Sequence, residues 1–303
     1  MRTRPANNKL IKAIGFAVLF LLISTPAALY YSKYYKERKE IPDFAVPVEH
    51  IQYQFQNEQL QVSYDNGSHW RTVPVSFEDL FFGEYNGSKQ ELIEGSYMIN
   101  PERTAFVVGD ETGLRLIQSE DRGKTWTEAD VPSPIPRVRL RLLGFTSEKN
   151  GYLILTGDRA MSFEANAILK TNDGGKSWYQ AGSVQATNTL LTDGGFVNDR
   201  LGFISFGTFS ALDHPDRPFL FRTADGGRNW SEVPVQIPAE YQGIFTIAEV
   251  PAFDGNQGTL LVNQGPNGDF QGGKVLAKFI SADEGATWSF TGIVDREGNA
   301  LED

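Results

Sequence analysis

The pattern of hydrophobic and polar positions divides this chain into an apolar N-terminal segment and a longer segment of alternating residues. Residues 13–31, AIGFAVLFLLISTPAALYY, are uncharged and mostly apolar over 19 positions, which is about the length that spans a bilayer core. Beyond residue 45 the apolar residues come in short alternating stretches such as WRTVPV (70–75) and WSEVPV (230–235). A period of two predicts β-strands with one buried face. The pattern therefore predicts one membrane helix followed by an all-β domain.

The flanks of the apolar run indicate its orientation. Four basic residues precede it, which favours an N-terminus inside, while four more follow within 33–39 and weaken that bias. We predict a cytoplasmic N-terminus (1–12), a transmembrane anchor (13–31), a stalk (32–44) and a domain (45–303) on the extracytoplasmic side of the cell membrane.

A cleaved signal peptide is the alternative interpretation of the same run. Its apolar region would be residues 13–23, with cleavage near Thr25–Ala28. The retained, single-pass anchor is favoured because the apolar run continues through Leu29.

An eight-residue motif, [ST]-x-D-x-G-x-x-W, repeats five times in the domain. The copies are SYDNGSHW (63–70), SEDRGKTW (119–126), TNDGGKSW (171–178), TADGGRNW (223–230) and SADEGATW (281–288). Their aspartates are spaced 56, 52, 52 and 58 residues apart, and all five tryptophans of the chain lie in the motif. Such a period indicates a repeat architecture. We call these segments the repeat turns.

The chemistry of the motif is that of a hairpin turn. The aspartate can accept backbone N–H bonds from residues ahead of it, the Ser or Thr can add another, and the glycine can adopt a positive φ. The tryptophan begins the returning strand and supplies a large packing surface. We therefore expect a structural role for Asp65, Gly67, Trp70, Asp121, Gly123, Trp126, Asp173, Gly175, Trp178, Asp225, Gly227, Trp230, Asp283, Gly285 and Trp288.

Each repeat has room for four short strands. A second hairpin recurs upstream of the turn, in GFTSEKNGYLI (144–154) and GFVNDRLGFIS (195–205). Four strands per roughly 50 residues is typical of a β-propeller blade. We predict five blades, with six as the alternative. The first blade is short, and we expect the C-terminal GIVDREGNALED (292–303) to supply its missing strand and close the ring.

The five repeat turns resemble the Asp-box, or bacterial-neuraminidase repeat, of sialidase-like propellers. The resemblance covers residues 45–303 and implies that the turns lie at the blade periphery, away from a central ligand site. Turns that end in DGG-x-x-W, as at 171–178 and 223–230, also resemble propellers of the photosystem II assembly factor type. That likeness implies a binding role without catalysis.

The composition of the chain excludes several classes of function. The chain has no cysteine and three scattered histidines, so we expect neither a disulfide nor a metal or other cofactor. Net charge is −10, and residues 41–303 hold 20 basic against 36 acidic residues. Such a body repels phosphates, so we expect no nucleic-acid partner.

A sialidase needs an arginine cluster that clamps the substrate carboxylate. In the family the first clamp arginine precedes the first turn, but residues 41–62 contain no arginine, and IPRVR (135–139) comes after the second turn. We therefore predict a non-catalytic binding or assembly scaffold that is not an enzyme. The alternative is a glycan-active sialidase-like hydrolase or lectin. We expect a monomer that binds an unknown protein or a neutral glycan.

Three long connections are candidates for partner binding, because recognition usually lies in loops. The first is 76–89, where Phe81, Phe82 and Tyr85 would be exposed unless they pack between blades. The second is 209–218 with His214, and the third is 263–273 with Pro266 and Phe270.

One basic cluster also stands out. Arg137, Arg139 and Arg141 alternate along an expected strand and should face one side together. They would bind an anion or, as we favour, acidic groups of the same protein.

Overall fold

The computed structural model describes residues 51–85, 87–160, 163–186, 189–208 and 217–300. The chain divides into two units, Met1–Glu49 and His50–Asp303, and the description below concerns the second. The predicted anchor at 13–31 lies outside the described residues. No helix in the described ranges is long and apolar enough to cross a membrane.

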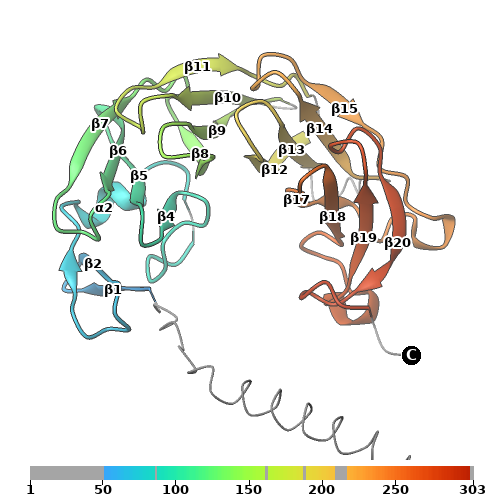
Figure 1. Ribbon diagram of the computed structural model, residues 1–303, viewed down its shortest axis with the longest axis horizontal. Coiled ribbons are helices and arrows are strands. Elements are labelled where there is room, and N and C mark those ends of the chain that lie inside the picture. The colour runs from blue at the N-terminus through green and yellow to red at the C-terminus, as the bar shows by residue number, and fades with distance from the viewer. Residues whose placement is uncertain (1–50, 86, 161–162, 187–188, 209–216, 301–303) are drawn as a thin grey trace, which may run out of the picture. The chain divides into compact units, whose positions relative to one another are not determined.

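The described chain is all-β, with five antiparallel sheets that follow one another in sequence (Figure 1). Sheet 1 contains β1 (Gln52–Gln56), β2 (Gln59–Ser63) and β3 (Arg71–Thr72). Sheet 2 contains β4 (Tyr97–Ile99), β5 (Thr104–Asp110), β6 (Gly113–Ser119) and β7 (Thr127–Val131). Sheet 3 contains β8 (Val138–Phe145), β9 (Gly151–Ala160), β10 (Phe163–Thr171) and β11 (Tyr179–Gly182).

Sheet 4 contains β12 (Thr189–Phe196), β13 (Gly202–Thr208), β14 (Phe219–Thr223) and β15 (Ser231–Val233). Sheet 5 contains β16 (Ile247–Ala248), β18 (Gln257–Asn263), β19 (Leu276–Ser281) and β20 (Ser289–Val294), with β17 (Ala252–Asp254) paired to β18. The short helices are α2 (Phe77–Leu80), η1 (Ala239–Tyr241) and η2 (Phe270–Gly273). Five sheets of this kind are consistent with a β-propeller.

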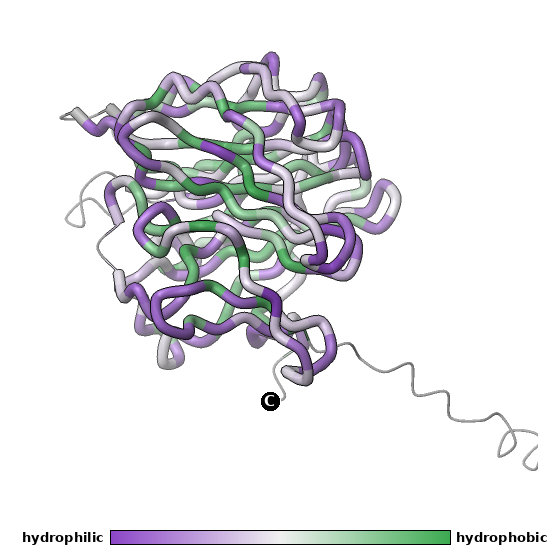
Figure 2. Tube along the Cα trace, turned by 90° about the vertical axis from the view of Figure 1, so that its left-hand side faces the viewer, coloured by the Kyte–Doolittle hydropathy of each residue, from purple (hydrophilic) through white to green (hydrophobic). Residues whose placement is uncertain are grey.

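Hydrophobic packing joins each sheet to the next. Four buried clusters lie between sheets 1 and 2, 2 and 3, 3 and 4, and 4 and 5. Sheet 2 is covered on both faces, so β5 (TAFVVGD) is buried along nearly its whole length, as expected for a strand between two layers. Figure 2 shows the same arrangement, with hydrophobic positions along the strands and hydrophilic ones at the turns.

The two end sheets differ from the inner ones. In sheet 1 the aliphatic and aromatic residues face sheet 2, while the glutamines of β1 and β2 lie on the other face. No buried cluster among the described residues joins sheet 5 to sheet 1. The outer face of sheet 1 therefore carries uncharged polar side chains instead of a core.

The expectation that the C-terminus supplies a strand to the first blade is wrong. Residues 292–294 belong to β20, which pairs with β19 inside sheet 5. Asp295 then accepts a backbone bond from Asn299, and Ala300 bridges back to Val294. This local turn folds residues 295–300 onto their own sheet, and sheet 1 has three strands in the part of the chain that the structure describes.

The repeat turns connect the third and fourth strands of sheets 2–5, and β2 to β3 in sheet 1. In the turn at 171–178, the Thr171 hydroxyl donates to Asp173 Oδ1 (2.8 Å) and accepts the Gly175 N–H (2.9 Å). Asp173 Oδ1 accepts the Ser177 N–H (2.9 Å), and Oδ2 accepts the Ser177 hydroxyl (2.5 Å). Gly175 has a φ of +85°, a conformation that glycine adopts without strain.

The same bonds recur in the other four turns. The residue before each tryptophan donates twice to the aspartate, through its backbone amide and its side chain; these residues are His69, Thr125, Asn229 and Thr287. These bonds are the largest influence on the carboxylates. They lower the pKa of all five aspartates to about 2.

The turn chemistry predicts the effect of removing one carboxylate. Asp173→Ala leaves the Lys176 and Ser177 amides without their acceptor, so the midpoint of thermal unfolding should fall. Circular dichroism measures it. The control is Asn172→Ala, an exposed neighbour in the same turn. Equal midpoints for the two variants would contradict the turn's structural role.

The lowered pKa values also predict acid sensitivity. Because the folded pKa of about 2 lies below the ordinary value of 3.8, ionised aspartates stabilise the fold fully above about pH 4. This stabilisation should be lost as the pH falls through about 2. Urea unfolding measured between pH 6 and pH 2 tests it, and Asp173→Asn should show a smaller loss than the unchanged protein. An identical pH dependence would argue against the assignment.

Candidate functional site

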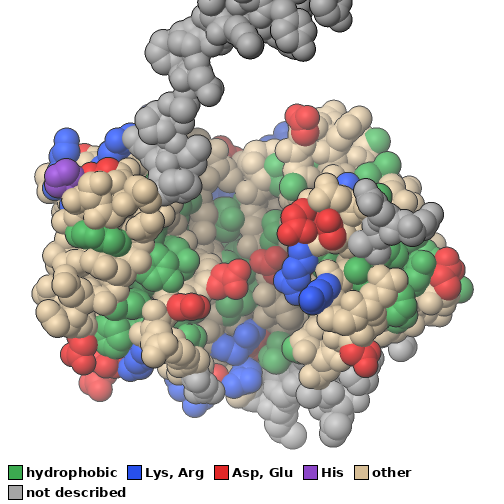
Figure 3. Space-filling view, turned by 90° about the horizontal axis from the view of Figure 1, so that it is seen from below, with side chains coloured by type: hydrophobic (Ala, Val, Ile, Leu, Met, Phe, Trp, Pro, Cys, Tyr) green, Lys and Arg blue, Asp and Glu red, His purple; other side chains and the backbone are tan. Residues whose placement is uncertain are grey.

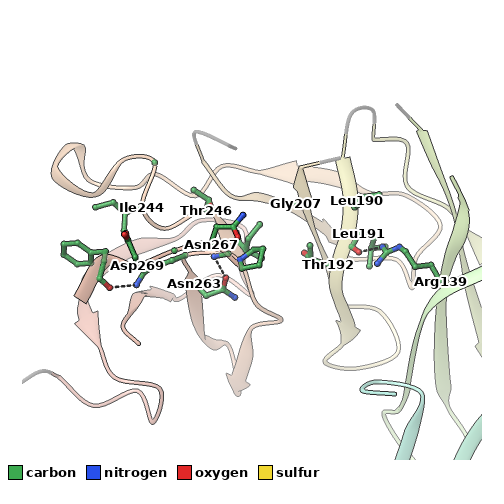
Figure 4. A pocket seen from close by; sticks show the side chains of 17 residues that line it. Arg139, Leu190, Leu191, Thr192, Gly207, Ile244, Thr246, Asn263, Asn267 and Asp269 are labelled. Carbon is green, nitrogen blue, oxygen red and sulfur yellow. Dashed lines mark hydrogen bonds between the residues drawn. The ribbon is translucent and has the colours of Figure 1, made fainter. Parts of the chain in front are cut away.

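A cavity of about 660 Å³ lies between sheets 4 and 5 and is the candidate site (Figure 4). One wall is the start of β12, with Leu190, Leu191 and Thr192, beside Arg139 of β8. The other wall is the segment before β16 together with the loop that follows β18. Its lining is more apolar than polar.

The loop after β18, residues 263–270, is part of the connection 263–273 that was singled out in the sequence. Asn263 Oδ1 accepts the Gly265 N–H (2.8 Å), and Gln264 Nε2 donates to the Phe270 and Val275 carbonyls (3.0 and 3.1 Å). A side chain at Gly268 would lie 2.1 Å from Gln264 Cβ, so this tight arrangement requires glycine there. These bonds fix the loop against the cavity.

Both candidate positions of that loop line the cavity. Pro266 is exposed. Phe270 packs edge-on against Tyr241 and Phe245, with ring centres 6.2 and 6.1 Å away. Phe270 therefore joins the cavity wall to the core of sheets 4 and 5.

Among the described residues, Arg139 supplies the one guanidinium that lines this cavity. This guanidinium is already paired with a carboxylate. Its Nε and Nη2 donate to Glu164 Oε1 and Oε2 at 2.5 and 3.0 Å, and Nη2 also donates to the Leu191 carbonyl (2.7 Å). The Glu164 carboxylate is buried and also accepts bonds from Thr156 and from the Leu191 amide. This bidentate pair neutralises the charge that would attract an anionic ligand.

The three arginines of β8 do not face one side together. A bulge between Val138 and Leu140 shifts the register, and an extra residue in a strand reverses the facing of those beyond it. Arg139 points to sheet 4, whereas Arg141 points to sheet 2 and donates to the Val107 and Phe82 carbonyls. Burial lowers the pKa of Arg141 to about 10.

Arg137 meets the favoured expectation that these arginines pair with acids of the same protein. It donates twice to Asp158 Oδ1, at 3.2 and 2.9 Å. Arg139 does the same with Glu164, but Arg141 binds backbone carbonyls instead. None of the three is left as a free anion clamp.

A second cavity of about 760 Å³ adjoins the first, since Thr192, Ile247 and Asn263 line both. Its walls hold three carboxylates, from Glu94, Asp193 and Glu249. Burial raises the pKa of Asp193, although its carboxylate accepts the Val250 and Gly194 amides. Figure 3 shows acidic and basic side chains gathered toward the middle of the face seen from below.

The aromatic candidates of residues 76–89 are not exposed as a patch. Phe81 is 5% exposed and packs with Phe77 and Tyr85, with ring centres 5.1 and 5.6 Å away. Phe82 packs against the core of sheets 2 and 3. Phe77 and Phe81 pack against Phe55 of β1, with ring centres 5.2 and 6.0 Å away, and α2 contacts β5. These two aromatics therefore fill the space between sheets 1 and 2.

His214 lies outside the described residues. Among the residues that are described, no group of three His, Cys, Asp or Glu side chains could hold a metal ion.

Sequence reasoning missed Glu164, Asp193 and the donor that precedes each tryptophan. Glu164 is the one acidic residue of the strand FEANAILKT, whose remaining residues are mostly apolar, and a lone acid in such a strand is a signal of a buried pair. The donor position could have been found because all five turns have a side chain there that can donate a hydrogen bond: His, Thr, Ser, Asn and Thr in sequence order.

Comparisons with known proteins found no matching family model and no matching curated protein. Solved structures do match. The GH74 xyloglucanase of Xanthomonas campestris is 12% identical with a TM-score of 0.38, over 79% of this chain and 43% of that chain. YCF48 bound to D1 peptide is 15% identical with a TM-score of 0.35, over 80% and 77%.

The α-L-arabinofuranosidase Arb93A of Fusarium graminearum is also 15% identical, with a TM-score of 0.42 over 65% of this chain and 64% of that chain. This chain spans less than half of the xyloglucanase. At these identities and TM-scores, the likenesses say nothing of activity.

The ion pair predicts a large effect of one change. Glu164→Ala leaves the Arg139 guanidinium without its carboxylate, and breaking a buried pair from one side costs about 2–4 kcal/mol after allowance for the partial exposure of Arg139. The double variant Arg139→Met/Glu164→Leu should recover most of that loss. Urea unfolding of the three proteins measures it, and a double variant no better than the single one would contradict the pairing.

Proposed function

We propose that this chain is an exported, membrane-anchored β-propeller of the Asp-box type that acts as a non-catalytic binding or assembly scaffold. The proposal places an uncharged segment of a partner, protein or neutral glycan, in the cavity between sheets 4 and 5. The observation that carries it is the pairing of Arg139 with Glu164. Among the described residues, the mainly apolar lining of the cavity thus has no free positive charge.

The chemistry of the cavity favours a ligand that offers acceptors and apolar surface. Arg139 Nη1 has no bond among the described residues and can donate to a carbonyl or hydroxyl oxygen. Leu190, Ile244 and Ile247 supply apolar contacts, as is usual in ligand cavities. The three carboxylates of the adjoining cavity oppose an anionic ligand.

A sialidase-like activity is the alternative, and the geometry gives it less support. A sialoside carboxylate needs several arginines around it. Within the described ranges, Arg139 is the arginine that lines the two adjoining cavities, and it is committed to Glu164.

Site-directed cross-linking tests the binding proposal, since the chain has no cysteine of its own. The full chain carrying Asn267→Cys, labelled with a photoreactive maleimide and mixed with native membranes, should give a defined adduct. The adduct should disappear when Ile247→Arg fills the cavity. Its yield should change less than about twofold between low and high salt, because contacts of uncharged groups are not screened.

The control places the same label at Asn256, an exposed asparagine in the β17–β18 turn, where no adduct is expected. Turnover of a sialoside reporter by the full chain, lost on Arg139→Ala, would overturn the non-catalytic proposal. Equal adduct yields from positions 256 and 267 would show that the partner does not bind in the cavity.

A further inference from the structure

Among the described residues, sheet 1 has no inner strand. In sheets 2–5 the repeat turn follows the third strand, but in sheet 1 it follows the second, β2. The strand without a counterpart is therefore the first one, the position taken by β4, β8, β12 and β16 in the other sheets. Within the described ranges, β2 is the strand that pairs with β1, so the other edge of β1 is open.

The backbone groups at this edge have no partner among the residues that the structure describes. Asn57 and Glu58 form a two-residue turn with φ values of 51° and 60°, so the flanking pair Gln56–Gln59 exchanges both of its hydrogen bonds and the pairs then alternate. Gln54 consequently bonds toward β2, while Tyr53 and Phe55 direct their N–H and C=O groups to the open edge. No described backbone group bonds to them there.

The two faces beside the edge have different chemistry. Tyr53 and Phe55 lie on the apolar face with Leu60 and Val62. They stay half-buried, although Phe106 and Val108 of β5, the equivalent strand of sheet 2, are 1% and 0% exposed. The other face is uncharged and polar, with Ser63 and Thr72 beside five glutamines: Gln52, Gln54, Gln56, Gln59 and Gln61.

The edge also lacks the devices that normally prevent pairing. Natural edge strands are protected by charged residues, proline or bulges. The strand QYQFQ carries no charge and no proline, and its register with β2 is regular. An open edge of this kind is a template for an added strand.

We propose that the open edge of β1 binds an extended segment of another polypeptide, which completes sheet 1 as its fourth, innermost strand. A single strand fits because one strand occupies this position in each of sheets 2–5. The segment alternates apolar residues, opposite Tyr53 and Phe55, with uncharged polar residues opposite the glutamines. This site is separate from the cavity of sheets 4 and 5 and does not depend on it.

Disulfide exchange tests the proposal in the full, detergent-solubilised chain, which has no other cysteine. The probe is the capped peptide Thr-Val-Cys-Val-Thr, with its cysteine activated as a disulfide to a coloured thiol. In the Gln54→Cys variant the introduced thiolate attacks the peptide sulfur and releases the coloured thiol, so one disulfide replaces another. Residues directly opposite in neighbouring strands have Cβ atoms about 4.5–5.5 Å apart, which is close to disulfide geometry.

Gln61→Cys is the matched control. Gln61 lies on the same face and is hydrogen-bonded to Gln54, but it is one strand farther from the edge, about 10 Å from the added strand. The adduct should form at least about tenfold faster at position 54 than at 61, since the second distance is beyond disulfide reach. Equal rates, or no adduct at position 54, would overturn the proposal.

N-methylation of the probe checks the backbone pairing. Methyl groups on both valine nitrogens remove the donors that face Tyr53 and Phe55 and should abolish the rate advantage. Methyl groups on both threonine nitrogens point away from β1 and should leave the rate advantage unchanged. If the two methylated probes behave alike, the adduct does not come from strand addition and the proposal fails.

Discussion

The hydrogen bonds of the repeat-turn aspartates are the constraint on which the rest of this structure depends. Each carboxylate holds together a hairpin that would otherwise leave several amides without partners, and it does so at nearly the same distances in all five copies. With the third and fourth strands fixed, each tryptophan begins the outer strand at a set position. Trp126, Trp178, Trp230 and Trp288 can then each pack against a phenylalanine of the sheet core.

The turns also connect one sheet to the next. Gln118, directly before the second turn's serine, donates to the Gly174 carbonyl of the third turn (2.8 Å). Arg222, in the equivalent position of the fourth repeat, donates to the Glu284 carbonyl of the fifth turn (2.8 Å). The fifth repeat has Ile280 at this position, and its side chain is 48% exposed. In the second and fourth repeats the residue before the turn therefore binds the turn of the next sheet, whereas Ile280 in the fifth repeat is half exposed.

Much of the fold could be predicted from the sequence because the motif is local. The turns, their spacing and the number of sheets follow from residues within eight positions of one another. The ends could not be placed in this way, since the pairing of the C-terminal residues depends on the Asp295–Asn299 turn competing with a distant sheet. The glutamine alternation in QYQFQ and QLQVS did contain the signal of an end sheet, because a strand covered on both faces would have had apolar residues at those positions.

The candidate site was less accessible to sequence reasoning. The loop at 263–270 could be singled out by its glycines and asparagines, but the partner of Arg139 lies 25 residues away on another strand. The bulge in β8 reversed the expected facing of Arg141, and no periodicity reveals a bulge in advance. Side chains that meet across strands therefore needed the structure.

Each sheet packs against the sheets next to it in the sequence, and this arrangement has a consequence for folding during synthesis. A propeller that closes through its two ends must keep its first sheet incomplete until the last residues emerge. Here the core of sheet 1 is covered by sheet 2, so its apolar residues find cover once the chain has reached Val131, the end of β7. Each later sheet is buried against one that already exists. The sheets can then fold one after another during synthesis, in their order along the sequence.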